Sequence, residues 1–543
     1  MKRPTLESMT LRQKIGQTGM PAPNAVAAGV RRCGGYKAYF EAFPFTGLYC
    51  SADMKQADDT LISGADELRH TLEECQKTLP LPLLVSCDAE LGARYFFEDF
   101  HRIPSMMSVG AANSPELAYW RSYYWARELR MCGINWPFGP VGDLLGNFVS
   151  VNGIRCMSDE PEIPEKLLPS VIRGIQDAGC AATAKHFPSG GRDYRDSHFC
   201  SNRITTPLDV WNRRSGKVWQ AAADADCASF MLGHSSFPAA DPGFARGSIP
   251  RPATASKKVM DILRKDMGFR GVAVTDAVSM KALAAAFDHE DVYIECFNAG
   301  NDVILFCHDD YIDVMEKAVL DGRVSMERLD EAVGRVLDLK QRLGLFGDLP
   351  EPQPLSEEEH AHFHRVCYDI GKNAITLLNN RNGALPFDPQ KVHRAAVIVL
   401  APYEPFREDL QVAIDALERR GIRVTVVNSL SSKHQLEDLA GSNDLLIYAC
   451  YLAQANPEGM PFYSRHEDLV TLFNGLSYGA EKSVAVSFGN PSIYYNYFEE
   501  ADIYLNAYSS DPDTMEAFVD GILGEFPFTG KSPVKLRPEF REL

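Results

Sequence analysis

The sequence lacks several features that define special classes of protein. It has no run of about 18 apolar residues, so we expect no transmembrane helix. Its first residues, MKRPTLESMTLRQKIGQ, carry basic side chains without a following apolar stretch, so we expect no secretory signal. Positive charge is scarce, because 55 Lys and Arg face 73 Asp and Glu for a net charge of −18. An acidic surface disfavours nucleic acid and anionic membranes as partners.

Nucleotide, metal and hydrolase motifs are also missing. There is no GxxxxGK[ST] loop, no GxGxxG after a strand, no GxSxG elbow and no HExxH pair. The 13 cysteines form no CxxC pair, so we expect no zinc or iron–sulfur site. Scattered thiols without a disulfide framework are typical of a reducing compartment, so we expect a cytoplasmic protein. We expect no cofactor and no bound metal.

Three histidines alternate along one segment, at His360, His362 and His364. Such a cluster can bind a metal when its side chains converge. On a helix, however, alternate spacing spreads the side chains around the cylinder. We therefore expect a solvated helix here.

The first two-thirds of the chain alternates short apolar runs with longer amphipathic segments. The runs are bounded by polar, Gly or Pro residues, as is typical of strands buried on both faces. Alternation over some 340 residues predicts a (β/α)8-type, TIM-like barrel, with the eighth strand hidden or absent. A helix is predicted from Ser114, which is a suitable N-cap, to about residue 130. The seven predicted strands are 46–50, 83–88, 134–138, 181–187, 227–233, 272–276 and 302–307.

The character of the sequence changes near residue 346. The segment FGDLPEPQPLSEEEHAHFH contains three prolines and an acidic stretch, as expected of a linker. Ser356 and Glu359 have the spacing of a capping box, which predicts that a helix follows. Five further strands, predicted at 395–400, 423–427, 444–449, 483–487 and 503–506, indicate a parallel sheet with helices on both faces. We therefore expect a barrel at 1–345, a linker and connecting helix at 346–372, and an α/β sandwich domain at 373–543.

The densest polar cluster, KHFPSGGRDYRDSHF at 185–199, directly follows a predicted barrel strand. Active sites of such barrels gather in the loops at the carboxyl ends of the strands. Asp196 and His198 lie two residues apart, so both point to the same side of an extended segment. A carboxylate beside an imidazole raises its pKa and fixes its tautomer, as in a general acid/base. By spacing alone, the commoner reading of such a pair is a surface ion pair.

A second candidate is the carboxylate at a strand tip in GVAVTDAVSMKAL, where an apolar strand ends at Thr275 and Asp276. A carboxylate at this position suits nucleophilic attack, and it equally suits the N-cap of a following helix. Asp88 and Asp143 also follow predicted strands. Several carboxylates at strand tips indicate a ligand rich in hydroxyl groups, because carboxylates bind hydroxyls by charge-assisted hydrogen bonds.

In their order and spacing, these motifs resemble glycoside hydrolase family 3, and most closely its β-N-acetylglucosaminidase branch. KHFPSGGRDYRDSH is similar to the branch's KHFPGHG followed by DSH, and TDAVSM resembles the family's TDAxxM. INWPFGPVGD is similar to INxxFAPVxD, and RPATASKKVMDILRKDMGFRG resembles the family's segment ahead of TDA. AITLLNN and SSDPDTMEAFVDGILGE resemble the α/β domain that longer members append.

The resemblance implies a retaining exo-β-glycosidase that removes terminal N-acetylglucosamine from muropeptides or chito-oligosaccharides. It implies that Asp276 is the nucleophile, that His198 is the acid/base, and that Asp196 orients the imidazole. It also implies that four residues bind sugar hydroxyls: Lys185, His186, Asp88 and Arg155.

Departures from the family pattern leave the substrate open. Ser189–Gly190 stands where the branch has Gly–His, Leu91 replaces a glycine, Val278 replaces leucine, and IRCMSDEP around Arg155 matches RSFGxDP loosely. The alternatives are a β-glucosidase or β-xylosidase, a phosphorylase, and a catalytically silent sugar-binding protein. Phosphorolysis is included because a neutral imidazole base does not repel phosphate. The expected partner is a small glycoside or oligosaccharide, joined by phosphate in the phosphorylase alternative.

Overall fold

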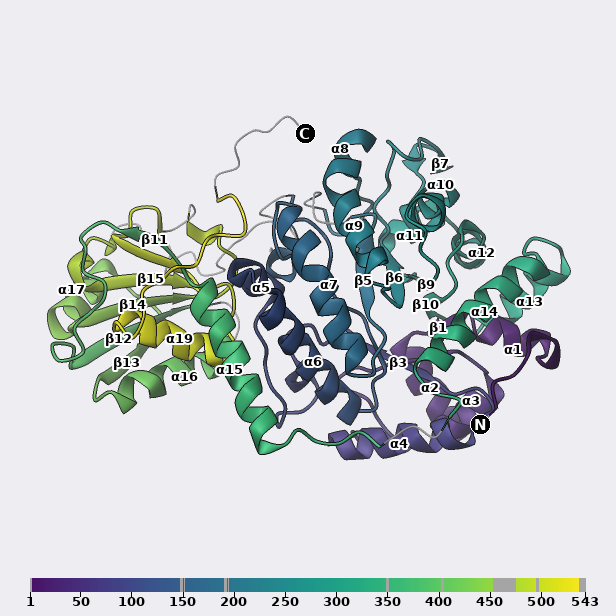
Figure 1. Cartoon of the computed structure of the whole chain (residues 1–543), viewed down its shortest axis with the longest axis horizontal. Coiled ribbons are helices and arrows are strands. Elements are labelled where there is room, and N and C mark those ends of the chain that lie inside the picture. Colours follow the sequence, from purple (N-terminus) through teal and green to yellow (C-terminus); the bar gives the residue numbers. More distant parts are fainter. Residues whose placement is uncertain are drawn as a thin grey trace.

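The computed structural model describes residues 2–536, apart from 147–149, 151, 190–192, 194, 348–350, 402–404, 453–474 and 495–497. Two α/β regions lie side by side, with the long helix α15 (Glu357–Ala374) between them (Figure 1). In the described part of the chain, no helix has the length and apolar character needed to cross a membrane.

Eight short strands carry the N-terminal region and pair in parallel in three ladders. The ladders are β1 with β10, β2–β3–β4, and β5–β6–β9. Single parallel bridges join Val141 to Lys185 and Val274 to Val303, so neighbouring ladders meet. The strands are β1 (Gly19–Pro21), β2 (Gly47–Tyr49), β3 (Leu84–Cys87), β4 (Trp136–Pro137), β5 (Thr183–Phe187), β6 (Ser229–Leu232), β9 (Val272–Thr275) and β10 (Ile304–Cys307).

The strands are short and apolar because both of their faces are covered. Along β6, Phe230 and Leu232 join the large core beneath the helices, while Met231 packs into a smaller cluster on the opposite face. This alternation follows the two-residue period of a strand. The seven strands expected from apolar runs are confirmed, and β1 supplies the eighth.

Helices cover the outer face of these strands (Figure 1). The predicted helix after Ser114 is confirmed as α6, and the Leu117 N–H donates to the Ser114 hydroxyl. The described helices of this region are α1 (Leu11–Gly16), α2 (Pro23–Cys33), α3 (Tyr36–Ala42), α4 (Ala65–Thr78), α5 (Met106–Ala112), α6 (Pro115–Met131), α7 (Glu162–Asp177), α8 (Leu208–Arg213), α9 (Ser215–Asp224), α10 (Lys257–Asp261), α11 (Lys281–Ala286), α12 (His289–Ala299), α13 (Tyr311–Leu320) and α14 (Met326–Arg342). A small hairpin, β7 (Phe244–Arg246) with β8 (Ile249–Pro250), precedes α10.

The C-terminal region is a six-stranded sheet in the order β11-β16-β15-β14-β12-β13. All five predicted strands are present, with helices on both faces. These five strands pair in parallel, as expected, and a sixth strand that was not predicted, β11, runs antiparallel to β16 at one edge. An edge strand pairs on one side only, and four of the five β11 residues are only partly buried. The elements are β11 (Thr376–Asn380), β12 (Arg394–Leu400), α16 (Pro405–Arg419), β13 (Arg423–Val427), α17 (Lys433–Ser442), β14 (Leu445–Cys450), β15 (Ser483–Ser487), β16 (Ile503–Asn506) and α19 (Pro512–Ile522).

Helix α15 joins the two regions and begins with the predicted capping box of Ser356 and Glu359. It contacts α5 and α6 on one side and α19 on the other. Its histidines therefore do not lie on a purely solvated helix. The Tyr124 hydroxyl is 2.8 Å from His362 Nδ1, and His364 meets a histidine of the N-terminal region.

Candidate active site

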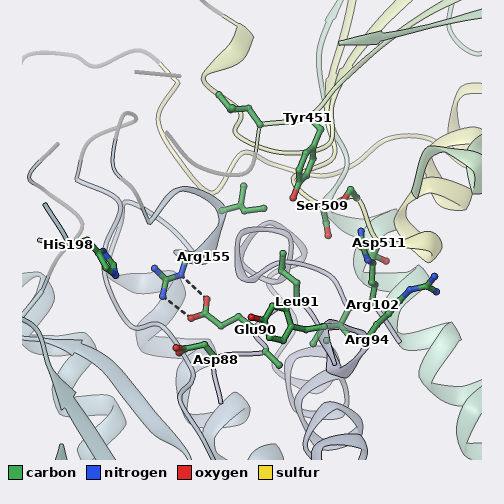
Figure 2. A pocket seen from close by; sticks show the side chains of 17 residues that line it. Asp88, Glu90, Leu91, Arg94, Arg102, Arg155, His198, Tyr451, Ser509 and Asp511 are labelled. Atoms are coloured by element: carbon green, nitrogen blue, oxygen red, sulfur yellow. Dashed lines mark hydrogen bonds and ion pairs between the residues drawn. The ribbon is translucent and has the colours of Figure 1, made fainter. Parts of the chain in front are cut away.

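A cleft of about 700 Å³ opens between the two regions. Figure 2 shows Asp88, Glu90 and Arg155 on one wall and Tyr451 and Ser509 of the C-terminal region on the other. Asp88 directly follows β3, so this wall is built at the carboxyl end of a strand, as expected.

Charged groups on the N-terminal wall form one network. The Lys185 ammonium, on β5, lies 2.5 Å from Asp88 Oδ1 and 2.6 Å from Glu90 Oε1. Arg155 holds Glu90 in a two-pronged ion pair, with both N···O distances at 2.8 Å. Tyr49 donates to the second Asp88 oxygen over 3.0 Å. Half of the Asp88 side chain stays exposed, so it can accept hydrogen bonds from a ligand.

The network keeps its buried members charged. Burial disfavours the Glu90 carboxylate, but Arg155 and Lys185 hold its pKa well below the ordinary value. Burial likewise disfavours the Lys185 ammonium, but Asp88 and Glu90 raise its pKa above the ordinary value. The wall therefore presents fixed charges of both signs, which suits a neutral ligand bearing hydroxyl groups.

His186, the neighbour of Lys185 on β5, has a fixed orientation. Its Nδ1 donates to Asp143 Oδ2 over 2.7 Å, and Asn152 donates to the same oxygen over 3.0 Å. Asp143 is fully buried. This carboxylate fixes the tautomer with hydrogen on Nδ1.

Asp276 follows β9 and is held by backbone hydrogen bonds. The Ala277 N–H donates to its Oδ1 over 2.8 Å, and its own N–H donates to the Leu232 carbonyl over 2.9 Å. Burial disfavours the Asp276 carboxylate, but its electrostatic interaction with His186 and other nearby groups lowers its pKa below the ordinary value. The carboxylate is therefore ionised at neutral pH, as a nucleophile requires.

His198 and Asp196 form the expected pair, but the segment turns instead of running extended, because the Phe199 and Cys200 N–H groups donate to the Asp196 carbonyl. Asp196 Oδ1 accepts from His198 Nδ1 over 2.7 Å and from the His198 N–H over 2.9 Å. The first of these hydrogen bonds raises the pKa of His198 above its ordinary value, although partial burial opposes this. The His198 side chain is 60% exposed and lines the cleft, so it can exchange protons with a bound ligand.

The loop carrying this pair is attached to the segment that follows Asp276. The Lys281 N–H donates to the His198 carbonyl over 3.3 Å, and the Ala282 N–H donates to the Ser197 carbonyl over 3.2 Å. Both donors belong to the first turn of α11. In addition, the Asp276 charge contributes to raising the His198 pKa. A carboxylate and an imidazole thus share one site, although they are 78 residues apart in the sequence.

The positions where the sequence departs from the family pattern lie around this site. Leu91 is 43% exposed and lines the cleft, whereas Val278 is buried and its N–H donates to the Leu305 carbonyl. Ser189 is buried, and Gly190 lies outside the described residues. These positions can change the shape of the cleft without altering the Asp276, Asp196 or His198 side chains.

All seven site residues predicted from the sequence lie in this part of the molecule. Asp88, Arg155 and His198 line the cleft directly. The other four are connected to the cleft through the ion pairs, hydrogen bonds and electrostatic interactions described above; they are Lys185, His186, Asp196 and Asp276.

Two residues of the site were missed. Glu90 forms ion pairs with both Arg155 and Lys185. The sequence feature that could have pointed to it is its position two residues after Asp88 in SCDAE. His234 lies just after the carboxyl end of β6, and this position could have pointed to it in the sequence. It is fully buried, with Nε2 2.9 Å from the Ala277 carbonyl oxygen and Nδ1 2.7 Å from the Thr254 hydroxyl.

Known proteins are similar to this chain in sequence. The model of the Glycosyl hydrolase family 3 N terminal domain matches residues 55–339. A Beta-N-acetylglucosaminidase/beta-glucosidase of Cellulomonas fimi is 29% identical over 488 residues, covering 86% of this chain and 85% of the relative. A Beta-hexosaminidase of Stenotrophomonas maltophilia (strain R551-3) is 30% identical over 276 residues, covering 49% of this chain and 76% of the relative.

Solved structures share the fold of nearly the whole chain. The structure "Beta-glucoside phosphorylase BglX bound to 2FGlc" superposes with a TM-score of 0.83 at 24% identity, covering 98% of this chain and 95% of that one. A glycoside hydrolase family 3 beta-N-acetylglucosaminidase from Paenibacillus sp. str. FPU-7 gives a TM-score of 0.81 at 24% identity, covering 97% and 99%.

Proposed function

The chain belongs to glycosyl hydrolase family 3 and is a glycoside hydrolase; from this we propose that it is a retaining exo-β-glycosidase acting on terminal β-N-acetylglucosaminides. Asp276 is the proposed nucleophile, His198 the acid/base and Asp196 the residue that orients the imidazole. The observation that carries this proposal is the attachment of the Asp196–His198 loop to the first turn of α11, the helix that follows Asp276. An ionised carboxylate and a protonated imidazole then act on one substrate.

In the first proposed step, Asp276 attacks the anomeric carbon as the bond to the leaving oxygen breaks. His198 donates its Nε2 proton to that oxygen, and Asp196 holds the Nδ1–H throughout. In the second step, neutral His198 takes a proton from water, whose oxygen attacks the anomeric carbon and releases the Asp276 carboxylate. The configuration is inverted twice and therefore retained.

We assign the binding of the sugar hydroxyls to Asp88, Arg155, Lys185 and His186. The half-exposed Asp88 carboxylate is the acceptor best placed to contact a ligand in the cleft. Lys185 and Arg155 also fix the Asp88 and Glu90 carboxylates through their ion pairs.

We further propose that the eight N-terminal strands close into a barrel spanning residues 1–345. The linker and connecting helix then span 346–372, and the α/β sandwich spans 373–543. Closure is supported by backbone hydrogen bonds across the three gaps between ladders, from Thr46 to Gly19, from Gly142 to Lys185 and from Thr275 to Val303.

Phosphorolysis is the second candidate, with phosphate as the acceptor in place of water. It is favoured by the identity of the acid/base, because a neutral His198 does not repel an anionic acceptor. The structural similarity to a protein described as a beta-glucoside phosphorylase is consistent with this reading.

Aryl glycosides test the proposal directly. Rates are compared for aryl N-acetyl-β-glucosaminide, β-glucoside and β-xyloside, each with and without phosphate. We expect the first to be preferred, and Asp276→Ala to abolish turnover. His198→Ala should slow substrates with poor leaving groups by about 10²- to 10⁴-fold and those with good leaving groups much less. Equal slowing of all leaving groups would contradict the acid role, and no turnover of any glycoside would favour a silent sugar-binding protein.

A further inference from the structure

Two histidines face each other where the two regions meet. His101 precedes α5 in the N-terminal region, and His364 lies on α15. Their Nε2 atoms are 3.2 Å apart, and their rings meet edge to face with centroids 4.7 Å apart. Neither residue has a part in the reaction proposed above.

A carboxylate holds the other ring nitrogen of each histidine. His101 Nδ1 is paired with Glu128 of α6, which also accepts the His101 N–H over 3.2 Å. His364 Nδ1 lies 3.1 and 3.3 Å from the two oxygens of Asp513, in the first turn of α19. Carboxylate oxygens accept hydrogen bonds, so each Nδ1 is placed as a donor and each Nε2 is left facing the other ring.

The two Nε2 atoms face each other across this contact at 3.2 Å. A hydrogen bond is one arrangement that holds two imidazole nitrogens at this distance, and a metal ion bound to both is the other.

The geometry fits a metal ion. Two imidazole nitrogens at about 2.0–2.1 Å from a tetrahedral zinc lie about 3.3 Å apart, close to the separation of His101 and His364. Histidine ligands of metals usually donate their second N–H to a carboxylate, which fixes the ring and increases its basicity. Here both histidines have such a carboxylate, in Glu128 and Asp513.

We propose that His101 and His364 bind a divalent transition-metal ion through their Nε2 atoms. Within the described residues, no group of three or more His, Cys, Asp or Glu is placed to hold a metal, so water completes the coordination. The His364 side chain is 55% exposed, which gives the ion and its water access from solvent. Imidazole ligands favour Cu²⁺ over Zn²⁺ and Ni²⁺ and exclude Mg²⁺, which prefers oxygen.

Such an ion would add a direct link between the two regions beside their hydrogen bonds. His101 belongs to the loop that carries Arg102 and Ile103, two residues that line the cleft. His364 and its partner Asp513 belong to α15 and α19. Bound metal would therefore stabilise the junction of the two regions next to the cleft, without entering the chemistry.

Calorimetric titration of the chelator-treated full chain with CuSO₄ and ZnCl₂ tests the proposal, with MgCl₂ as the negative control. His364→Ala is the test variant because it leaves buried Glu128 paired with His101. His434→Ala is the matched control, since His434 also lies on a helix beside a carboxylate, with its Nδ1 3.4 Å from Glu437. We expect the wild-type chain to bind one metal ion with high affinity. The affinity should fall at least tenfold in His364→Ala and stay unchanged in His434→Ala.

A second measurement, the change in Tm when metal is added, separates loss of the metal site from a folding defect in the variant. Addition of ZnCl₂ should raise the Tm of the wild-type chain and of His434→Ala but not that of His364→Ala. Absence of binding, or binding and a Tm shift that are equal in all three proteins, would overturn the proposal. The pair would then share only a proton.

Discussion

At the scale of single residues, Asp196 controls the protonation of His198. The hydrogen bond between them raises the pKa of the imidazole, so the acid form persists to higher pH. The pH dependence of kcat/KM reports the ionisation of groups in the free enzyme. Its alkaline limb should therefore follow the loss of the His198 proton, and its acid limb the protonation of Asp276.

Asp196→Asn should move the alkaline limb of kcat/KM to lower pH. The amide removes the negative charge that favours the imidazolium, so the His198 pKa falls. Asp193→Asn is the matched control, because Asp193 holds the same loop through the N–H groups of Arg195 and Arg203 and does not contact His198. In the control, kcat/KM should fall while its alkaline limb stays at the wild-type pH. An unshifted limb in Asp196→Asn would contradict the assignment of His198.

His234 is expected to act as a positioning residue. Through the Ala277 carbonyl it holds the backbone that directly follows Asp276, the proposed nucleophile. His234→Ala should lower kcat by about 10²-fold with little change in KM, because small displacements of a reacting group are costly. His234→Gln keeps a donor to the carbonyl and should recover part of the rate. An equal rise in KM for both variants would show a different role.

The sequence was informative about residues whose chemistry is contained in a short motif. Asp196 and His198 lie two residues apart in the chain, and Asp276 ends an apolar run, so the pairing of the first two and the placement of Asp276 follow from local geometry. Glu90 and His234 depend on partners from distant segments of the chain. No local spacing records that Glu90 will meet Arg155, because the fold alone brings them together.

At the scale of secondary structure elements, the apolar runs indicated the buried strands because both faces of each strand are covered. The exceptions are instructive. Strand β1, with the sequence GMP, has no β-branched or aromatic residue and only three positions, so it carries no pattern. Strand β11 pairs antiparallel at an edge, and strand direction is set by how the chain enters the sheet.

The close packing of α15 on α19 gives a stability prediction. A Cβ atom on Gly371 would lie 2.8 Å from the Thr514 Cα of α19, so a helix backbone would have to shift. Gly371→Ala should therefore lower the free energy of unfolding by about 1–3 kcal/mol, the usual cost of overpacking. Thermal and denaturant unfolding measure this change.

Gly334 of α14 supplies the matched control, because a Cβ there meets nothing within 4 Å. Gly334→Ala should raise stability by about 0.5–1 kcal/mol through the loss of backbone freedom in the unfolded chain. Equal effects of the two substitutions would contradict the packing argument.

At the scale of the whole molecule, the cleft exists only because the two regions meet. Residues 451–452 and 509–511 form its second wall, and Ser105 donates to the Tyr508 carbonyl across the junction over 2.8 Å. This arrangement could not be read from the sequence. The linker predicted two regions, but nothing local specifies which surfaces come together.

Substitution of Arg94 tests whether the aglycone of the substrate binds in the cleft. It is exposed and lines the cleft, where its charge suits an anionic aglycone such as a muropeptide. Arg94→Ala should raise KM several-fold for a muropeptide and leave KM for an aryl N-acetylglucosaminide unchanged. Arg423→Ala, on the exposed end of β13, should change neither. If KM for the muropeptide is the same in Arg94→Ala and Arg423→Ala, the aglycone does not bind at Arg94.

The most direct test of the account is the mass of the enzyme after reaction with 5-fluoro-N-acetyl-β-glucosaminyl fluoride. The fluorine slows both steps, and the good leaving group lets the first step proceed, so the glycosyl-enzyme accumulates. We predict one added sugar per chain, carried by the peptide that contains Asp276 and absent in Asp276→Ala. An adduct on another carboxylate, or turnover to a product of inverted configuration without any adduct, would contradict the account.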